Sequence, residues 1–156
     1  MEKQLKIAEI ARIAMTIEEK GSNFYSALAV KVEDGRAKQV FNKLAEEEKE
    51  HRRVFEKIHS TYDSEEILDP EASAYLAAVL RGNVFPGAST LKDFVEEIRT
   101  VKDALAIGVQ AEKDAILLYH ELITRTKSEK ARKMLYDLLE EEKIHLTELR
   151  NYFEEL

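Results

Sequence analysis

Two octapeptides, LAEEEKEH at residues 44–51 and LLEEEKIH at residues 138–145, decide the fold that this sequence predicts. They lie 94 residues apart and are identical at six of eight positions. The chain holds four histidines, and one of them ends each octapeptide. Similarity at a fixed interval indicates a duplicated structural unit, so the same interval is expected to relate other parts of the chain.

The 94-residue interval does relate other parts of the chain. It matches carboxylates, aromatic residues and residues typical of helix caps, in the pairs Glu18 and Glu112, Tyr25 and Tyr119, and Asp34 and Ser128. The spacing from Glu18 to Glu48 is 30 residues, and the spacing from Glu112 to Glu142 is also 30. The sequence therefore predicts two copies of one helical design.

The first copy is predicted to be a helical hairpin over about residues 5–59. Apolar residues recur at steps of three and four through residues 5–31, as in an amphipathic helix. Asp34-Gly35 is typical of a short turn, with Asp34 capping a second helix that ends at about His59. A connection this short makes the two helices antiparallel.

The second copy is predicted over about residues 100–154. Thr100 through Asp103 has the pattern of a capping box and begins a helix that reaches about Arg125. Lys127-Ser128 then caps the last helix, which is expected over about residues 129–153. The second copy is therefore also an antiparallel hairpin.

Residues 60–99 form the long crossover between the two hairpins. Asp69-Pro70 begins a short helix that Gly82 ends. Thr90 through Asp93 has the pattern of a capping box and predicts a second short helix. Between them, Val84-Phe85 is expected to be exposed and to serve a contact in a homodimer.

Together these patterns predict one all-α domain over residues 1–156, an antiparallel four-helix bundle of two pseudo-repeated hairpins. Hydrophobic residues make up 44% of the chain, enough for a sizeable core. A net charge of −7 argues against nucleic-acid and anionic-membrane partners, and no segment approaches the roughly 20 apolar residues of a membrane span. The absence of cysteine excludes thiolate metal sites and favours a reducing, cytoplasmic location.

Polar residues interrupt the apolar seams of the predicted helices at repeated positions. Glu48 and His51 stand where the second helix would otherwise bury Leu or Phe, and Glu142 and His145 do so in the fourth. A buried carboxylate needs a partner, and a spacing of three places each Glu beside its His on one helical face. With one Glu from each other helix, the sequence predicts a two-metal site of six ligands: Glu18, Glu48, His51, Glu112, Glu142 and His145.

The charges of these six side chains suit two divalent ions. Four carboxylates carry −4 and two neutral imidazoles carry none, so two ions of charge +2 cancel them. Mixed carboxylate and imidazole ligation suits two ions of iron or manganese, and zinc could also occupy the site. The alternative without metal is a buried polar network.

Some other polar residues have no residue of the same kind at the 94-residue interval. Glu56 and His59 have the same spacing but fall on Arg150 and Phe153 at the 94-residue interval, and Glu19 falls on Lys113. His59 and His120 are therefore expected at the surface, outside the site.

Tyr25 and Tyr119 each lie seven residues after a predicted ligand, about 10.5 Å farther along the helix axis. Neither can reach the Glu of its own helix. Each is expected either to hydrogen-bond a metal ligand on a facing helix and so hold that ligand in place, or to be a core aromatic residue.

The motifs resemble those of the rubrerythrin family of ferritin-like di-iron carboxylate proteins. The matching stretches are residues 18–25, 44–51, 112–119 and 138–145, and the resemblance covers almost the whole chain. It implies a ferritin-like bundle whose six ligands bind two irons and reduce hydrogen peroxide or O2 with electrons from an external donor such as a rubredoxin-like protein. The chain departs from rubrerythrins proper at Ala115, where they carry an extra carboxylate, and in lacking the four cysteines of a rubredoxin domain.

Three functions remain open from the sequence. The first is the di-iron oxidoreductase that the resemblance implies. The second is a ferroxidase that handles iron for storage or buffering, although the 60–99 insertion disfavours a compact ferritin-type shell. The third is a non-catalytic metal-binding helical module.

Overall fold

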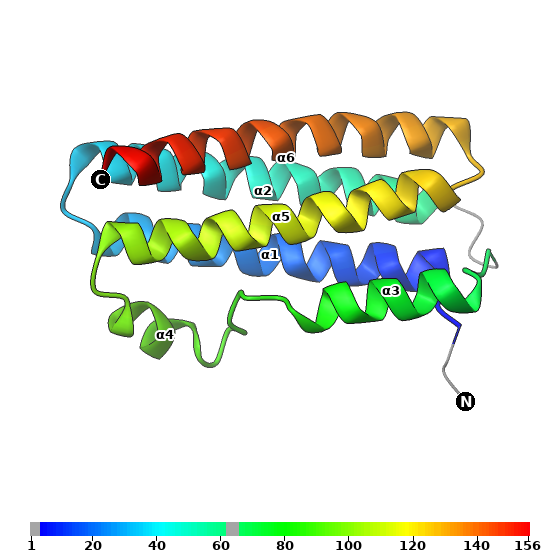
Figure 1. The fold of residues 1–156 in the computed structure, drawn as a ribbon, viewed down its shortest axis with the longest axis horizontal. Helices are drawn as coiled ribbons and strands as arrows, with labels where there is room; N and C mark the ends of the chain where they lie inside the picture. Colours follow the sequence, from blue (N-terminus) through cyan, green and yellow to red (C-terminus); the bar gives the residue numbers. More distant parts are fainter. Residues whose placement is uncertain (1–3, 62–65) are drawn as a thin grey trace.

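The computed structural model describes residues 4–61 and 66–156, which contain six helices (Figure 1). The four long helices form the bundle, and they are α1 (Ile7–Lys31), α2 (Gly35–Thr61), α5 (Val101–Arg125) and α6 (Glu129–Glu155). Two short helices, α3 (Pro70–Arg81) and α4 (Leu91–Glu97), lie in the crossover. The predicted all-α fold of two antiparallel hairpins is confirmed. No helix in the described part of the chain is long and apolar enough to cross a membrane.

Side-chain caps fix where four of the helices begin. Each cap accepts a hydrogen bond from the backbone N–H three residues later, at 2.8–3.2 Å, and these caps are Asp34, Asp69, Thr100 and Ser128. The capping box predicted at Thr90 is wrong. Thr90 has φ −112° and ψ −3°, not the extended backbone usual for a cap, and its hydroxyl donates to the Gly87 carbonyl at 3.3 Å.

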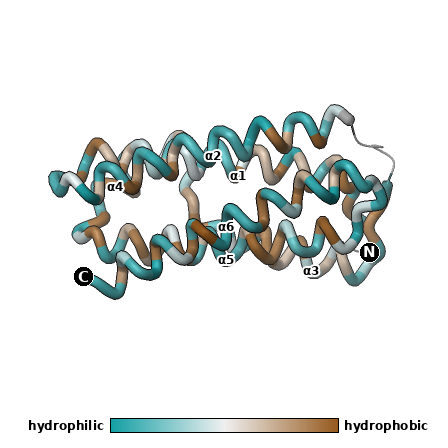
Figure 2. The backbone as a smooth tube through the Cα atoms, turned by 90° about the horizontal axis from the view of Figure 1, so that it is seen from above, coloured by the Kyte–Doolittle hydropathy of each residue, from teal (hydrophilic) through white to brown (hydrophobic). Residues whose placement is uncertain are grey.

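The long helices bury their apolar stripes against one another, and hydrophobic and hydrophilic residues alternate along each of them (Figure 2). The core consists of two apolar clusters, one containing Phe24 and Phe41 and the other containing Phe55 and Leu135. Along α1 and α2, the predicted ligands Glu18, Glu48 and His51 lie between the residues of one cluster and the residues of the other. The polar residues of the bundle therefore form a layer between two apolar cores.

The crossover is attached to the bundle by specific contacts. Lys31, at the end of α1, donates hydrogen bonds to the backbone carbonyls of Val95, Glu96 and Ile98 at the carboxyl end of α4. A lysine is favourable there, because helix carboxyl ends carry partial negative charge and carbonyls without helical partners.

The prediction that Val84-Phe85 is exposed is wrong for Phe85, whose exposed fraction is 8%, while Val84 is half-buried. The Phe85 ring packs against Phe24 and Tyr25, with centroid distances of 5.3 and 5.8 Å. It also covers Gly21, where a Cβ atom would lie 2.9 Å from Phe85 Cε2. An aromatic ring therefore fills the place where α1 has no side chain, and it is not available for a dimer contact.

Candidate metal centre

All six residues predicted as ligands lie together in the middle of the bundle. Each of the long helices supplies one glutamate, and α2 and α6 each add a histidine three residues later. Their exposed fractions are between 0% and 5%: Glu18, Glu48, His51, Glu112, Glu142 and His145. These six buried polar side chains form the layer that separates the two apolar cores, and they are called the metal layer below.

The six side chains form two overlapping sets of four. One set is Glu18, Glu48, His51 and Glu142, and the other is Glu48, Glu112, Glu142 and His145. Within each set, the ligand atoms lie within 4.8 Å of one another. Two ligands on opposite sides of an ion at roughly 2.0–2.2 Å would be about 4.4 Å apart, so each set suits one ion. Glu48 and Glu142 belong to both sets and are placed to bridge two ions.

Both histidines turn the same ring nitrogen towards the carboxylates of the layer. His51 Nδ1 lies 2.7 Å from Glu142 Oε1 and 3.6 Å from Glu18 Oε2. His145 Nδ1 lies 3.3 Å from Glu142 Oε2 and 3.6 Å from Glu48 Oε1. The two rings are stacked, with centroids 5.4 Å apart and planes inclined by 19°. Nδ1 is therefore the nitrogen that each histidine would present to a metal.

The outer ring nitrogens are held by two glutamates that the sequence analysis did not single out. His51 Nε2 donates to Glu141 Oε2 at 2.7 Å, and His145 Nε2 contacts Glu47 Oε2. Each carboxylate comes from the helix opposite its histidine. A carboxylate on the outer nitrogen fixes the tautomer and orientation of a metal-binding histidine. The available signal was the repeat itself, because Glu47 and Glu141 match at the 94-residue interval.

Burial and crowding change the proton affinities of these groups. Burial, and then the neighbouring carboxylates, raise the pKa values of Glu18 and Glu112 well above the usual range. Burial opposes ionisation of Glu142 too, but contacts with Glu112, His145 and His51 outweigh it and lower the pKa of Glu142. Burial alone would lower the pKa of His145, yet Glu142 and Glu48 raise it to about 10. Without metal, the layer therefore retains protons that metal ions would displace.

The residues present fit two metal ions. Four inward-facing atoms are buried and have no hydrogen-bond partner among the described residues: Glu18 Oε2, Glu48 Oε1, His51 Nδ1 and Glu142 Oε1. Orphaned buried polar atoms are rare in proteins, since each costs about 1–3 kcal/mol. Two divalent ions would give these atoms partners and cancel the four carboxylate charges. Their role as ligands stays a prediction.

Tyr25 contacts the metal layer from the facing hairpin. Its hydroxyl donates to Glu112 Oε1 at 3.4 Å, and its side chain is fully buried. Gly108 makes room for this contact, because a Cβ atom there would lie 3.0 Å from the Tyr25 hydroxyl oxygen. Burial and the nearby carboxylates Glu112 and Glu48 raise the pKa of Tyr25, so its hydroxyl stays protonated and able to donate.

Tyr119 differs from its repeat partner. Its ring packs against Phe55, with centroids 5.2 Å apart, and its side chain borders a small cavity. The sequence left two alternatives for each tyrosine. Tyr25 hydrogen-bonds a predicted ligand on a facing helix, whereas Tyr119 is a core aromatic residue. His120 is exposed and His59 half-buried, and neither joins the metal layer.

Comparison with known proteins gives the same picture. The sequence model of the family described as Rubrerythrin matches residues 9–153. Among solved structures, a protein from Thermotoga maritima described as a ferritin-like diiron-carboxylate protein aligns with a TM-score of 0.80 and 26% identity, over 99% of each chain. No curated protein matches the sequence significantly.

Proposed function

Because the chain belongs to the rubrerythrin family, we propose that it is a di-iron oxidoreductase that reduces hydrogen peroxide or O2 with electrons from an external donor protein. The observation that carries this proposal is the pair of four-residue sets that share Glu48 and Glu142. Shared carboxylates suit two ions held close together, which is the arrangement that two-metal chemistry requires. The described relative, a diiron-carboxylate protein, supports iron as the metal.

Two bound Fe(II) ions would supply two electrons, enough to convert one hydrogen peroxide and two protons into two waters. The side chains hold the arrangement in place. Glu141 accepts a hydrogen bond from Nε2 of His51, and Glu47 contacts Nε2 of His145, so that both imidazoles are kept turned inward. Tyr25 donates to Glu112 and restrains that carboxylate.

The reducing electrons would come from another protein. The sequence contains no cysteine, so it has no thiolate ligands for an iron–sulfur or rubredoxin-type centre of its own. The proposed donor is a rubredoxin-like protein. Its electrons would enter on the side where the exposed Glu141 and the half-buried Glu47 lie between the histidines and solvent.

Anaerobic loading with Fe(II), followed by mixing with hydrogen peroxide or with O2, tests this function. We expect two irons per chain, rapid oxidation by at least one oxidant, and repeated turnover when a chemical or protein reductant is supplied. Oxidation by O2 with many irons retained per chain would instead indicate iron storage. Loaded protein that reacts with neither oxidant would reject an enzymatic role and leave a binding module.

A further inference from the structure

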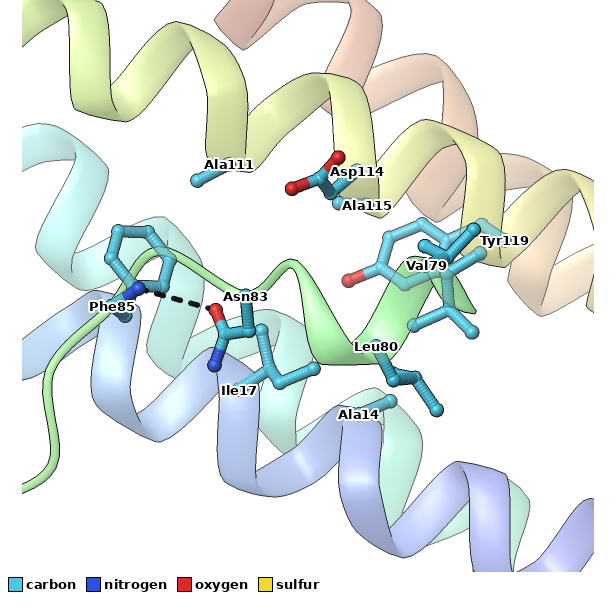
Figure 3. Close-up of a pocket in the computed structure, with 11 residues that line it drawn as sticks. Ala14, Ile17, Val79, Leu80, Asn83, Phe85, Ala111, Asp114, Ala115 and Tyr119 are labelled. Carbon is cyan, nitrogen blue, oxygen red and sulfur yellow. Dashed lines mark hydrogen bonds between the residues drawn. The ribbon is translucent and has the colours of Figure 1, made fainter. Parts of the chain in front are cut away.

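A small and largely enclosed cavity lies between α1 and α5, under the end of α3 and the segment that follows it (Figure 3). Its volume is about 20 Å³, slightly more than the roughly 10–15 Å³ that one water needs on the same measure. Apolar side chains from α1, the crossover and α5 make up most of the wall, among them Ala14, Ile17, Val79, Leu80 and Ala115. The cavity therefore has room for one very small molecule.

The cavity adjoins the metal layer. Each helical residue turns about 100° and advances about 1.5 Å. Ala14, four residues before Glu18, is thus about 40° round the helix from that ligand and about 6 Å along it. Ala115, three residues after Glu112, is about 60° round and about 4.5 Å along, turned in the same sense. Because α1 and α5 run antiparallel, both displacements point to the same end of the bundle (Figure 1).

The cavity exists because the crossover breaks the symmetry of the two hairpins. At the 94-residue interval Ala115 corresponds to Gly21. The Phe85 ring fills the space over Gly21, as its 2.9 Å approach to a Cβ there shows. Over Ala115 the crossover supplies the smaller side chains of Val79 and Leu80, and these leave the cavity.

The walls select for an uncharged molecule. Moving an ion into a space lined mainly by apolar groups is costly, whereas apolar cavities of this kind accept small neutral molecules. Three polar side chains also line the cavity, namely Asn83, Asp114 and Tyr119. Asp114 Oδ2 is buried without a hydrogen-bond partner, while its other oxygen accepts from Gln110 at 3.0 Å. A carboxylate oxygen can accept a hydrogen bond from hydrogen peroxide, and dioxygen needs none.

We propose that this cavity is the chamber through which dioxygen or hydrogen peroxide reaches the metal layer, entering between α1 and α5. The inference rests on the proposed function, because it assigns a route to the oxidant of that reaction. It adds that the crossover residues Val79 and Leu80, far from the ligands in sequence, shape the access of the substrate.

Xenon tests the chamber without iron or turnover. Crystals of the wild-type protein pressurised with xenon are expected to show an atom between Ala14 and Ala115, and crystals of Ala115→Leu are expected to lack it. Ala106→Leu adds the same side chain at an exposed position of α5 and should keep the xenon. No xenon in the wild-type cavity would overturn the inference.

Oxidation kinetics test the route. In anaerobically loaded protein that still binds two Fe(II), Ala115→Leu is expected to slow oxidation by roughly tenfold or more, as when added methylene groups meet a pocket without room for them. Ala14→Val fills the same cavity from α1 with a smaller side chain and replaces Ala115→Leu if that variant does not fold. Ala106→Leu should react at the wild-type rate.

The two oxidants, used separately, identify the occupant. Slowing with O2 alone assigns the chamber to dioxygen, slowing with peroxide alone assigns it to hydrogen peroxide, and slowing with both assigns it to both. If wild-type iron reacts and the filled variants react equally fast, the inference falls while the proposed function stands. If wild-type iron reacts with neither oxidant, both fall together.

Discussion

Replacing Glu142 by Gln should weaken both metal sites, whereas replacing Glu18 by Gln should remove only one. The difference follows from the geometry, because Glu142 belongs to both sets of four ligands and Glu18 to one. Glutamine keeps the size of the side chain and removes its charge. We therefore expect two irons per chain in the wild-type protein, one in Glu18→Gln and weak binding at both sites in Glu142→Gln.

The expected effect on stability can be worked out from binding. An ion at a hundredfold excess over its dissociation constant stabilises the folded state by about 2.7 kcal/mol, so two ions give about 5.4 kcal/mol. For a chain of this size each kcal/mol raises Tm by roughly 2–4 °C. Fe(II) should then raise Tm by roughly 10–20 °C in the wild-type protein and by about half as much in Glu18→Gln.

Anaerobic calorimetric titration gives the stoichiometry, and melting with and without Fe(II) gives the shift. Comparing loaded with metal-free protein within each variant removes the effect of the substitution on the fold itself. Glu19→Gln is the matched control, since Glu19 is exposed and only approaches Arg52 at 3.8 Å. Two irons bound at wild-type affinity by Glu142→Gln, or both lost from Glu18→Gln, would refute the shared-ligand arrangement.

Three further predictions concern the surroundings of the metals. Glu47→Gln and Glu141→Gln should each lower metal affinity by roughly 10- to 100-fold without changing the stoichiometry, because the outer histidine nitrogen loses its carboxylate; calorimetry showing unchanged affinity would dismiss this role. Gly108→Ala should lower Tm, since crowding against the Tyr25 hydroxyl costs about 1–3 kcal/mol and exceeds the roughly 1 kcal/mol gained in helix propensity; a higher Tm would mean that Tyr25 moves aside freely. The metal-free protein should lose stability as pH rises from about 6.5 to about 10, because folded His145 keeps a proton that the unfolded chain releases. Thermal melts at several pH values check this, and the loaded protein should not show the loss, since metal displaces the proton.

The six residues of the metal layer could be found from the sequence because two independent patterns coincide on them. A seam of apolar residues at helical spacing marks which face is buried, and the 94-residue repeat marks which polar residues on that face belong together. Most helix caps could also be predicted, because a cap such as Asp34 or Ser128 contacts backbone only three residues away. The cap predicted at Thr90 does not form, because capping depends on backbone angles that cannot be derived from the sequence pattern.

Contacts between distant segments could not be predicted in this way. Glu47 and Glu141 each lie one residue before a ligand, about 100° round the helix, where the pattern indicates solvent. Only the packing of α2 against α6 brings each carboxylate to the histidine opposite. Phe85 lies in a segment without helical periodicity, and its partner Gly21 is 64 residues away, so nothing local signals its burial.

The repeat accounts for what is symmetric in this protein, and the crossover accounts for what is not. The six predicted ligands and the carboxylates behind the histidines match at the 94-residue interval, so the two sets of four residues have nearly the same surroundings on the α2 and α6 side. That side is charged, because Glu47 and Glu141 reach solvent there. On the α1 and α5 side a single segment must cover two equivalent positions, and it does so with an aromatic ring at Gly21 and with aliphatic side chains at Ala115. The duplicated bundle is therefore asymmetric on this side, with a filled position at Gly21 and a small cavity at Ala115, which is the cavity proposed above as the route of the oxidant.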